Sequence, residues 1–116
     1  MMKHLIPVLF AAGAVLLAAA DESRAQTQEI CPDRPVPPDW VVVDILARTG
    51  RCRPGHLDKM LKIQNTRMMQ AGAALRVCLG SPLPRGWVVT GKERCAACCG
   101  AAGQPVERNI IKKIKN

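Results

Sequence analysis

The sequence predicts a small, mainly β, disulfide-rich fold built from two duplicated three-stranded modules. The first observation is an internal repeat, in which Cys31–Val43 (CPDRPVPPDWVVV) matches Cys78–Thr90 (CLGSPLPRGWVVT) without a gap. This repeat holds both tryptophans of the chain, Trp40 and Trp87. The second observation is that the 116 residues include six cysteines. Two copies are too few for a solenoid, so the repeat indicates one duplicated unit.

The match extends beyond this segment and sets the expected module boundaries. Arg51-Cys52 is matched with Arg94-Cys95, and Lys62–Asn65 with Lys113–Asn116. We therefore expect a first module at 26–65, a linker at 66–74 and a basic, cysteine-rich second module at 75–116.

The first 25 residues have the pattern of a secretory signal peptide. A weakly basic start precedes an apolar run, and Ser23-Arg24-Ala25 supplies small residues at a cleavage site. The apolar run, residues 5–20, is shorter than the ~20 residues that a spanning helix needs. No cysteine follows the run closely enough to form a lipobox. These features predict a periplasmic or secreted protein.

Three strands are expected in the first module. A short strand should end at Ile30, and the proline-dense segment 32–38 should be extended or turning. Trp40–Val43 with Ile45 is aromatic and β-branched, which favours a strand. A turn region at 48–55 contains Cys52, and a third strand is expected at Met60–Gln64.

The third strand has an alternative interpretation. Leu57, Met60, Leu61 and Met68 have helical spacing, so a helix around 57–70 would give an α+β fold. The strand is preferred because duplicated modules should fold alike, and the matching segment is rich in isoleucine. In the second module we expect strands at 75–78, 87–90 and 109–115, with a loop at 92–103.

The cysteines indicate a disulfide framework in an oxidising compartment. The simplest pairing joins Cys31 to Cys52 and Cys78 to Cys95, which leaves Cys98 and Cys99 in the second module. These two would pair with each other, pair with another chain, or displace Cys95 as the partner of Cys78. Six cysteines allow 15 pairings.

Cys95, Cys98 and Cys99 also form a candidate thiolate metal site for zinc or copper. A closed zinc site needs four ligands, and Cys78 or His56 would supply the fourth. A redox role would need a thioredoxin-like setting, which the sequence does not indicate. Without such a metal, no cofactor is expected.

No catalytic constellation is visible, and we expect a protein without enzymatic activity. His56 has no evident nucleophile and orienting carboxylate, and Asp44 and Asp58 are two ordinary aspartates. Trp40 and Trp87 are candidate ligand platforms, but core positions are favoured because few other large side chains are present.

Positive charge is concentrated in the second half. Residues 26–65 carry six Lys and Arg against five Asp and Glu, whereas residues 66–116 carry nine against two. Such a surface attracts polyanions, although charge alone is also typical of simple solubility. The expected partner is an anionic envelope polymer or membrane surface, and there is no nucleic-acid motif. The candidate anion-binding residues are Arg85, Lys92, Arg94, Arg108, Lys112, Lys113 and Lys115.

Alternation along the last predicted strand assigns its lysines to two faces. Lys113 and Lys115 should be exposed, whereas Lys112 should share the packed face with Ile110 and Ile114.

The repeat C-x3-P-x-P-x-G-W/Y-V-V-T resembles repeats in uncharacterised secreted proteins of Gram-negative bacteria. Pro84, Gly86 and Trp87–Thr90 match this pattern, whereas the first copy has Asp39 in place of the glycine and Val43 in place of the threonine. The resemblance implies an envelope or secreted location and no particular activity.

Overall fold

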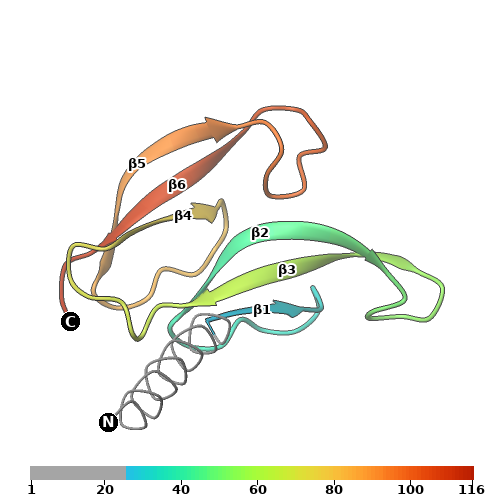
Figure 1. Ribbon diagram of the computed structural model, residues 1–116, viewed down its shortest axis with the longest axis horizontal. Helices are drawn as coiled ribbons and strands as arrows, with labels where there is room; N and C mark the ends of the chain where they lie inside the picture. Colours follow the sequence, from blue (N-terminus) through green and yellow to red (C-terminus); the bar gives the residue numbers. More distant parts are fainter. Residues whose placement is uncertain (1–25) are drawn as a thin grey trace, which may run out of the picture.

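Each module folds as a three-stranded antiparallel sheet whose last strand lies in the middle. The computed structural model describes residues 26–116, and Figure 1 shows the two sheets. The first has the order β1-β3-β2, with β1 (Thr27–Ile30), β2 (Trp40–Thr49) and β3 (Leu57–Asn65). The second has the order β4-β6-β5, with β4 (Ala74–Cys78), β5 (Trp87–Cys95) and β6 (Val106–Lys113). The predicted mainly-β fold of two modules is confirmed.

The helix considered for residues 57–70 is wrong, because Leu57–Asn65 is the central strand of the first sheet. Three strands are clearly longer than expected, since β2 continues to Thr49, β3 already begins at Leu57, and β5 continues to Cys95, into the predicted loop. The signal-peptide prediction concerns residues 1–25, which lie outside the described residues. Among residues 26–116 there is no helix long and apolar enough to cross a membrane.

The two sheets have the same strand register. Val42 pairs with Ile63 and Val89 with Ile111, and an irregularity follows each valine. Trp40 pairs with Asn65, and Trp87 pairs with Lys113. The structure therefore corrects the sequence match, because Asn65 corresponds to Lys113 and not to Asn116.

The backbone conformation before each tryptophan explains why the first copy of the repeat has aspartate and the second has glycine at this position. Asp39 and Gly86 both have left-handed backbones, with φ of 68° and 83°. Glycine adopts this conformation without strain, and aspartate tolerates it better than most residues. Each carbonyl accepts a backbone N–H from beyond the third strand, from Thr66 at 2.9 Å and from Ile114 at 2.7 Å. The turn thus fixes the start of β2 and β5 in the same way.

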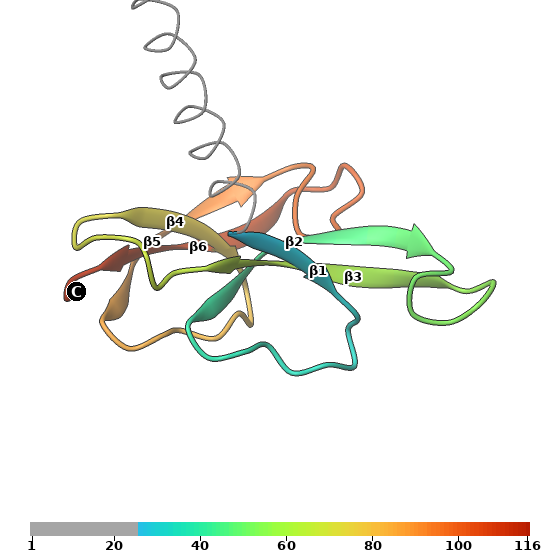
Figure 2. The same cartoon turned by 60° about the horizontal axis from the view of Figure 1, so that its bottom comes forward.

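The two modules share their hydrophobic cores. Val41 of β2 is buried with Val77, Trp87 and Ile111 of the second sheet. Cys78 of β4 is buried in the other cluster, with Val42 and Ile63 of the first sheet. Figures 1 and 2 show β4 lying beside β2, and these strands form the main contact between the sheets. Trp87 has the core position expected for it, whereas Trp40 is half-buried.

Candidate functional site

A basic pocket lies where β5 begins, next to the segment that links the modules. Its volume is about 310 Å³. The left-handed turn at Gly86 forms part of its wall, and the end of the chain closes it because Ile114 N–H bonds to Gly86. Four cationic residues from three parts of the chain line this basic pocket, namely Arg67, Arg85, Lys113 and Lys115, together with Asp39, Thr66, Gly86, Trp87 and Asn116.

The four cationic side chains of the basic pocket differ in the partners that they already have within the protein. The guanidinium of Arg67 donates to the carboxylate of Asp39 at 3.0 Å. Lys113 is only 8% exposed, and its ammonium donates to the carbonyl of Met69 at 2.6 Å. Arg85 and Lys115 are exposed side chains. Arg85 and Lys115 are therefore the two groups best placed to meet an anion from solvent.

An apolar groove adjoins the basic pocket. The proline-rich turns of the two repeats lie side by side and enclose about 400 Å³. Asp39 and Arg85 line both this groove and the basic pocket. The other residues of the apolar groove are Val36, Pro37, Pro38, Trp40, Pro82, Leu83 and Pro84. A charged ligand with an apolar or ring-shaped portion would thus meet both kinds of surface.

The structure brings together three of the seven predicted anion-binding residues, namely Arg85, Lys113 and Lys115. Arg108 is instead engaged across the sheet, where it donates to Glu93 at 2.6 Å. The remaining three are exposed on β5 and β6 and do not line the basic pocket, namely Lys92, Arg94 and Lys112.

The predicted facing of the last strand is wrong. β6 ends at Lys113, and Lys113 shares the buried face with Ile111. Lys112 and Ile114 are exposed instead. The cause is the register, since Lys113 lies opposite Trp87 in the interior and its ammonium finds a carbonyl acceptor there.

Arg67 and Asp39 were not among the predicted site residues. Asp39 has a sequence signal, because it replaces the glycine of the other repeat copy at a position next to the tryptophan. Arg67 has none, since it follows the third strand in the linker and only the fold places it beside Asp39.

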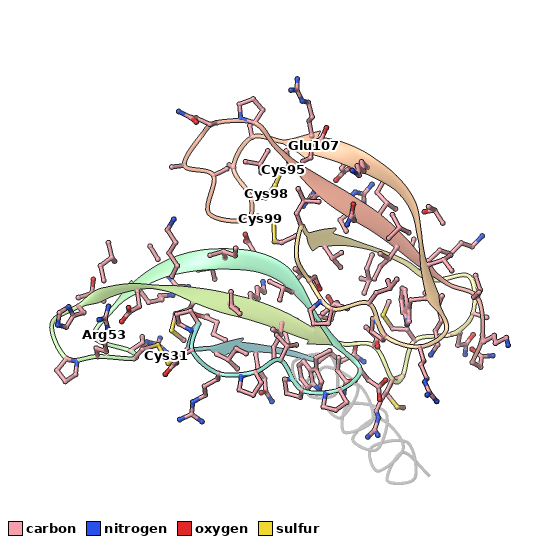
Figure 3. The ribbon with its side chains drawn as sticks, turned by 180° about the vertical axis from the view of Figure 1, so that it is seen from behind. Cys31, Arg53, Cys95, Cys98, Cys99 and Glu107 are labelled. Carbon is pink, nitrogen blue, oxygen red and sulfur yellow. A yellow bond between two sulfur atoms is a disulfide. The ribbon has the colours of Figure 1, made fainter. Side chains whose placement is uncertain are left out.

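All six cysteines form disulfides within the chain. The predicted bond between Cys31 and Cys52 is confirmed. The predicted bond between Cys78 and Cys95 is wrong, because Cys78 is bonded to Cys99, and Cys95 to Cys98. Figure 3 shows Cys95 and Cys98 together, with Cys99 beside them on the side of the first sheet. Three disulfides in a domain of this size are typical of an oxidising compartment.

The thiolate metal site predicted at Cys95, Cys98 and Cys99 would need these sulfurs as free thiolates. In the structure each of them is bonded to another sulfur. Within residues 26–116 no group of three His, Cys, Asp or Glu side chains is arranged to hold a metal ion.

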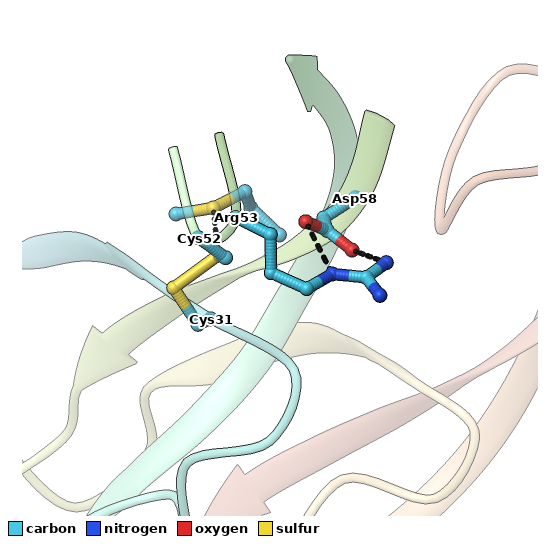
Figure 4. Close-up of polar contacts among 5 residues, drawn as sticks. Cys31, Cys52, Arg53 and Asp58 are labelled. Carbon is cyan, nitrogen blue, oxygen red and sulfur yellow. Dashed lines mark hydrogen bonds and ion pairs between the residues drawn. A yellow bond between two sulfur atoms is a disulfide. The ribbon is translucent and has the colours of Figure 1, made fainter. Parts of the chain in front are cut away.

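Asp44 and Asp58 have separate structural partners. Asp44 accepts the backbone N–H of Cys99 at 2.8 Å, which joins β2 to the second module. Asp58 is buried and pairs with Arg53 at 2.7 Å, next to the Cys31–Cys52 bond (Figure 4). The hydrogen bond from Arg53 lowers the pKa of Asp58 below that of an ordinary aspartate. His56 is exposed in the same hairpin loop.

In comparisons with protein-family models, with curated proteins and with solved structures, nothing matches this chain. The features of the molecule that bear on function are therefore its fold and the two adjoining cavities.

Proposed function

We propose that the protein is a secreted or periplasmic, non-enzymatic module that binds an anionic polymer or lipid of the envelope through its basic second half. The observation that supports this best is the exposed pair Arg85 and Lys115 at the mouth of the basic pocket. Both side chains reach solvent, and in the described structure neither forms an ion pair with a carboxylate. Their charge is therefore free to attract an external anion.

The surroundings of this pair are mostly positive, and the carboxylate of Asp39, which also lines the basic pocket, is paired with Arg67. Residues 66–116 carry nine Lys and Arg against two Asp and Glu, so the field over this half is positive. Of the two acids, Glu93 is engaged by Arg76 at 2.8 Å and by Arg108. The apolar groove beside Arg85 offers a second contact to a lipid or to a sugar ring.

The experiment is binding to heparin and, separately, to vesicles containing phosphatidylglycerol, at low and at high salt. The two arms distinguish a polymer from a lipid surface. The wild type is compared with Arg85→Glu/Lys115→Glu and with a control of equal charge change outside the basic pocket, Lys92→Glu/Arg94→Glu. We expect the pocket variant to lose most of its retention and the control to lose less, and binding should weaken as salt rises.

Equal loss in the two double variants would mean that net charge, and not the basic pocket, governs binding. Retention that neither variant changes would contradict the proposal. A zinc titration of the oxidised and of the reduced protein tests the thiolate alternative separately.

A further inference from the structure

β2 and β5 have the same place in their modules but very different exposure. Val41 is 0% exposed, whereas Val88 at the equivalent position of β5 is 36% exposed. Val42 is 7% exposed, whereas the equivalent Val89 is 48% exposed. The same Val-Val pair is therefore covered in the first module and exposed in the second.

The cover over β2 comes from the first strand of the next module and the turn that follows it. Val41 packs against Val77 and Trp87. The backbone N–H of Val42 donates to Ser81 Oγ at 2.8 Å, and Asp44 accepts from Cys99. β4, the turn at Ser81 and the Cys78–Cys99 bond together occupy the outer edge of β2.

This contact is heterologous. β2 of the first module meets β4 of the second module, and β4 corresponds to β1, not to β2. The counterparts of the contacting strands, β5 and β1, are the outer strands of the two sheets, on the sides away from this contact. A heterologous contact always leaves one unfilled surface of each kind, which a further copy can fill.

We propose that the β5 edge of one chain docks on β1 and the Cys31–Cys52 bond of a second copy, repeating between chains the contact that β2 makes within the chain. In the second copy, Ile30 stands where Val77 stands, and Trp40 stands where Trp87 stands. The Cys31–Cys52 bond corresponds to the Cys78–Cys99 bond. The surface that covers β2 thus has a counterpart on the first module.

The receiving surface is open and has a suitable charge. Thr27, Gln28 and Glu29 of β1 are exposed. Residues 26–65 carry six Lys and Arg against five Asp and Glu, so they do not repel the strongly basic second half. Pairing of two β5 edges would bring two strongly basic halves together, which disfavours a symmetric dimer.

The contact between chains should be weaker than the one within the chain. Gln28 replaces Leu75 and Arg34 replaces Ser81 at the receiving surface, so it has less apolar area and lacks the hydroxyl that accepts from the β2 backbone. The two modules are also joined covalently, which raises the effective concentration of the internal contact. We therefore expect reversible, concentration-dependent association.

The test is the molar mass in solution, measured by sedimentation or light scattering across a concentration series. Val88→Glu blocks the docking edge, and Gln28→Arg blocks the receiving strand on the face it shares with Ile63. We expect each variant alone to be monomeric, their mixture to form a dimer, and the double variant to stay monomeric even in mixtures. Leu57→Glu is the control, because Leu57 is an apolar side chain, 66% exposed, at the start of β3.

Circular dichroism melts check that the variants remain folded, since both altered side chains are exposed. A wild type that is monomeric at about 1 mM, where a millimolar contact is half formed, overturns the proposal. It is equally overturned if Gln28→Arg still dimerises while Val88→Glu does not, because that pattern means a symmetric β5 pair. Unchanged association in both variants would place the interface elsewhere and also contradicts it.

Discussion

Cys78 is bonded to Cys99, and this bond spans 21 residues, as does the bond between Cys31 and Cys52. The two bonds are therefore the repeated ones, and Cys95–Cys98 is an addition to the second module. Cys99 also donates its backbone N–H to Asp44 of the first module. The repeated disulfide of the second module is thus part of the contact between the sheets.

Removing the repeated disulfide of the second module should cost more stability than removing the added one. On the chain-entropy model, a bond that closes a loop of this length contributes about 3 kcal/mol, and one that closes four residues about 2 kcal/mol. The loss of Cys78–Cys99 also disturbs the buried cluster with Val42 and Ile63. Urea unfolding of Cys78→Ser/Cys99→Ser and Cys95→Ser/Cys98→Ser measures the difference. A larger loss in the second variant would mean that the added bond holds the module together.

Asn109→Leu should stabilise the protein by about 1–2 kcal/mol. Among residues 26–116, Asn109 Oδ1 is the buried side-chain oxygen or nitrogen without a hydrogen-bond partner. Asn109 pairs with Val77 as Leu61 pairs with Ile30, so the first module already uses leucine at this position. Denaturant melts of the wild type and of Asn109→Leu test this. As a control, Leu61→Asn should destabilise, and a leucine variant that is less stable than the wild type would show that the amide has a partner.

Stability should decrease at acid pH in a way that depends on Glu93. A hydrogen bond from Arg76, assisted by Arg108, lowers the pKa of Glu93 from its ordinary value of 4.5. A group with a depressed pKa in the folded state stabilises above its unfolded pKa, and this contribution disappears as pH falls through the folded pKa. The wild type should therefore exceed Glu93→Gln in melting temperature near neutral pH, and the gap should close as the pH falls below 4.5 and through the lowered pKa of Glu93.

The matched control for this series is Glu107→Gln, since Glu107 is exposed on the neighbouring strand (Figure 3). It removes the same charge without touching the two arginines. A gap between the wild type and Glu93→Gln that is constant from pH 7 to about pH 3 would mean that the ion pairs do not carry the effect.

The sequence was sufficient for the fold but only partly for the site. The gap-free repeat and the β-branched runs predicted two three-stranded modules, because strand propensity and duplication are local properties. The Cys78 partner was misassigned because Arg94-Cys95 resembles Arg51-Cys52 more closely than Cys98-Cys99 does. The gap-free offset of the repeat, which matches Cys31 with Cys78, also matches Cys52 with Cys99, so the sequence did contain this signal, and the disulfides agree with it.

The misplacement of Lys113 has a related cause. Simple alternation counted from Ile110 assigns Lys113 to the surface, but the packed face is set by Ile111, which lies opposite both Leu75 and Val89. The acceptor of its ammonium, Met69 O, lies 44 residues earlier in the chain. Arg67 was missed for the same reason, since its partner Asp39 is 28 residues away. Partners so distant in sequence leave no local signal.

The sharing of the two cores determines how the molecule comes apart. Val41 belongs to the core of the second sheet and Cys78 to that of the first, so opening either sheet exposes buried surface in both. Separate melting of two such small units is thereby suppressed. The duplicated chain should behave as one cooperative unit, with a single calorimetric transition whose measured enthalpy equals the van't Hoff value.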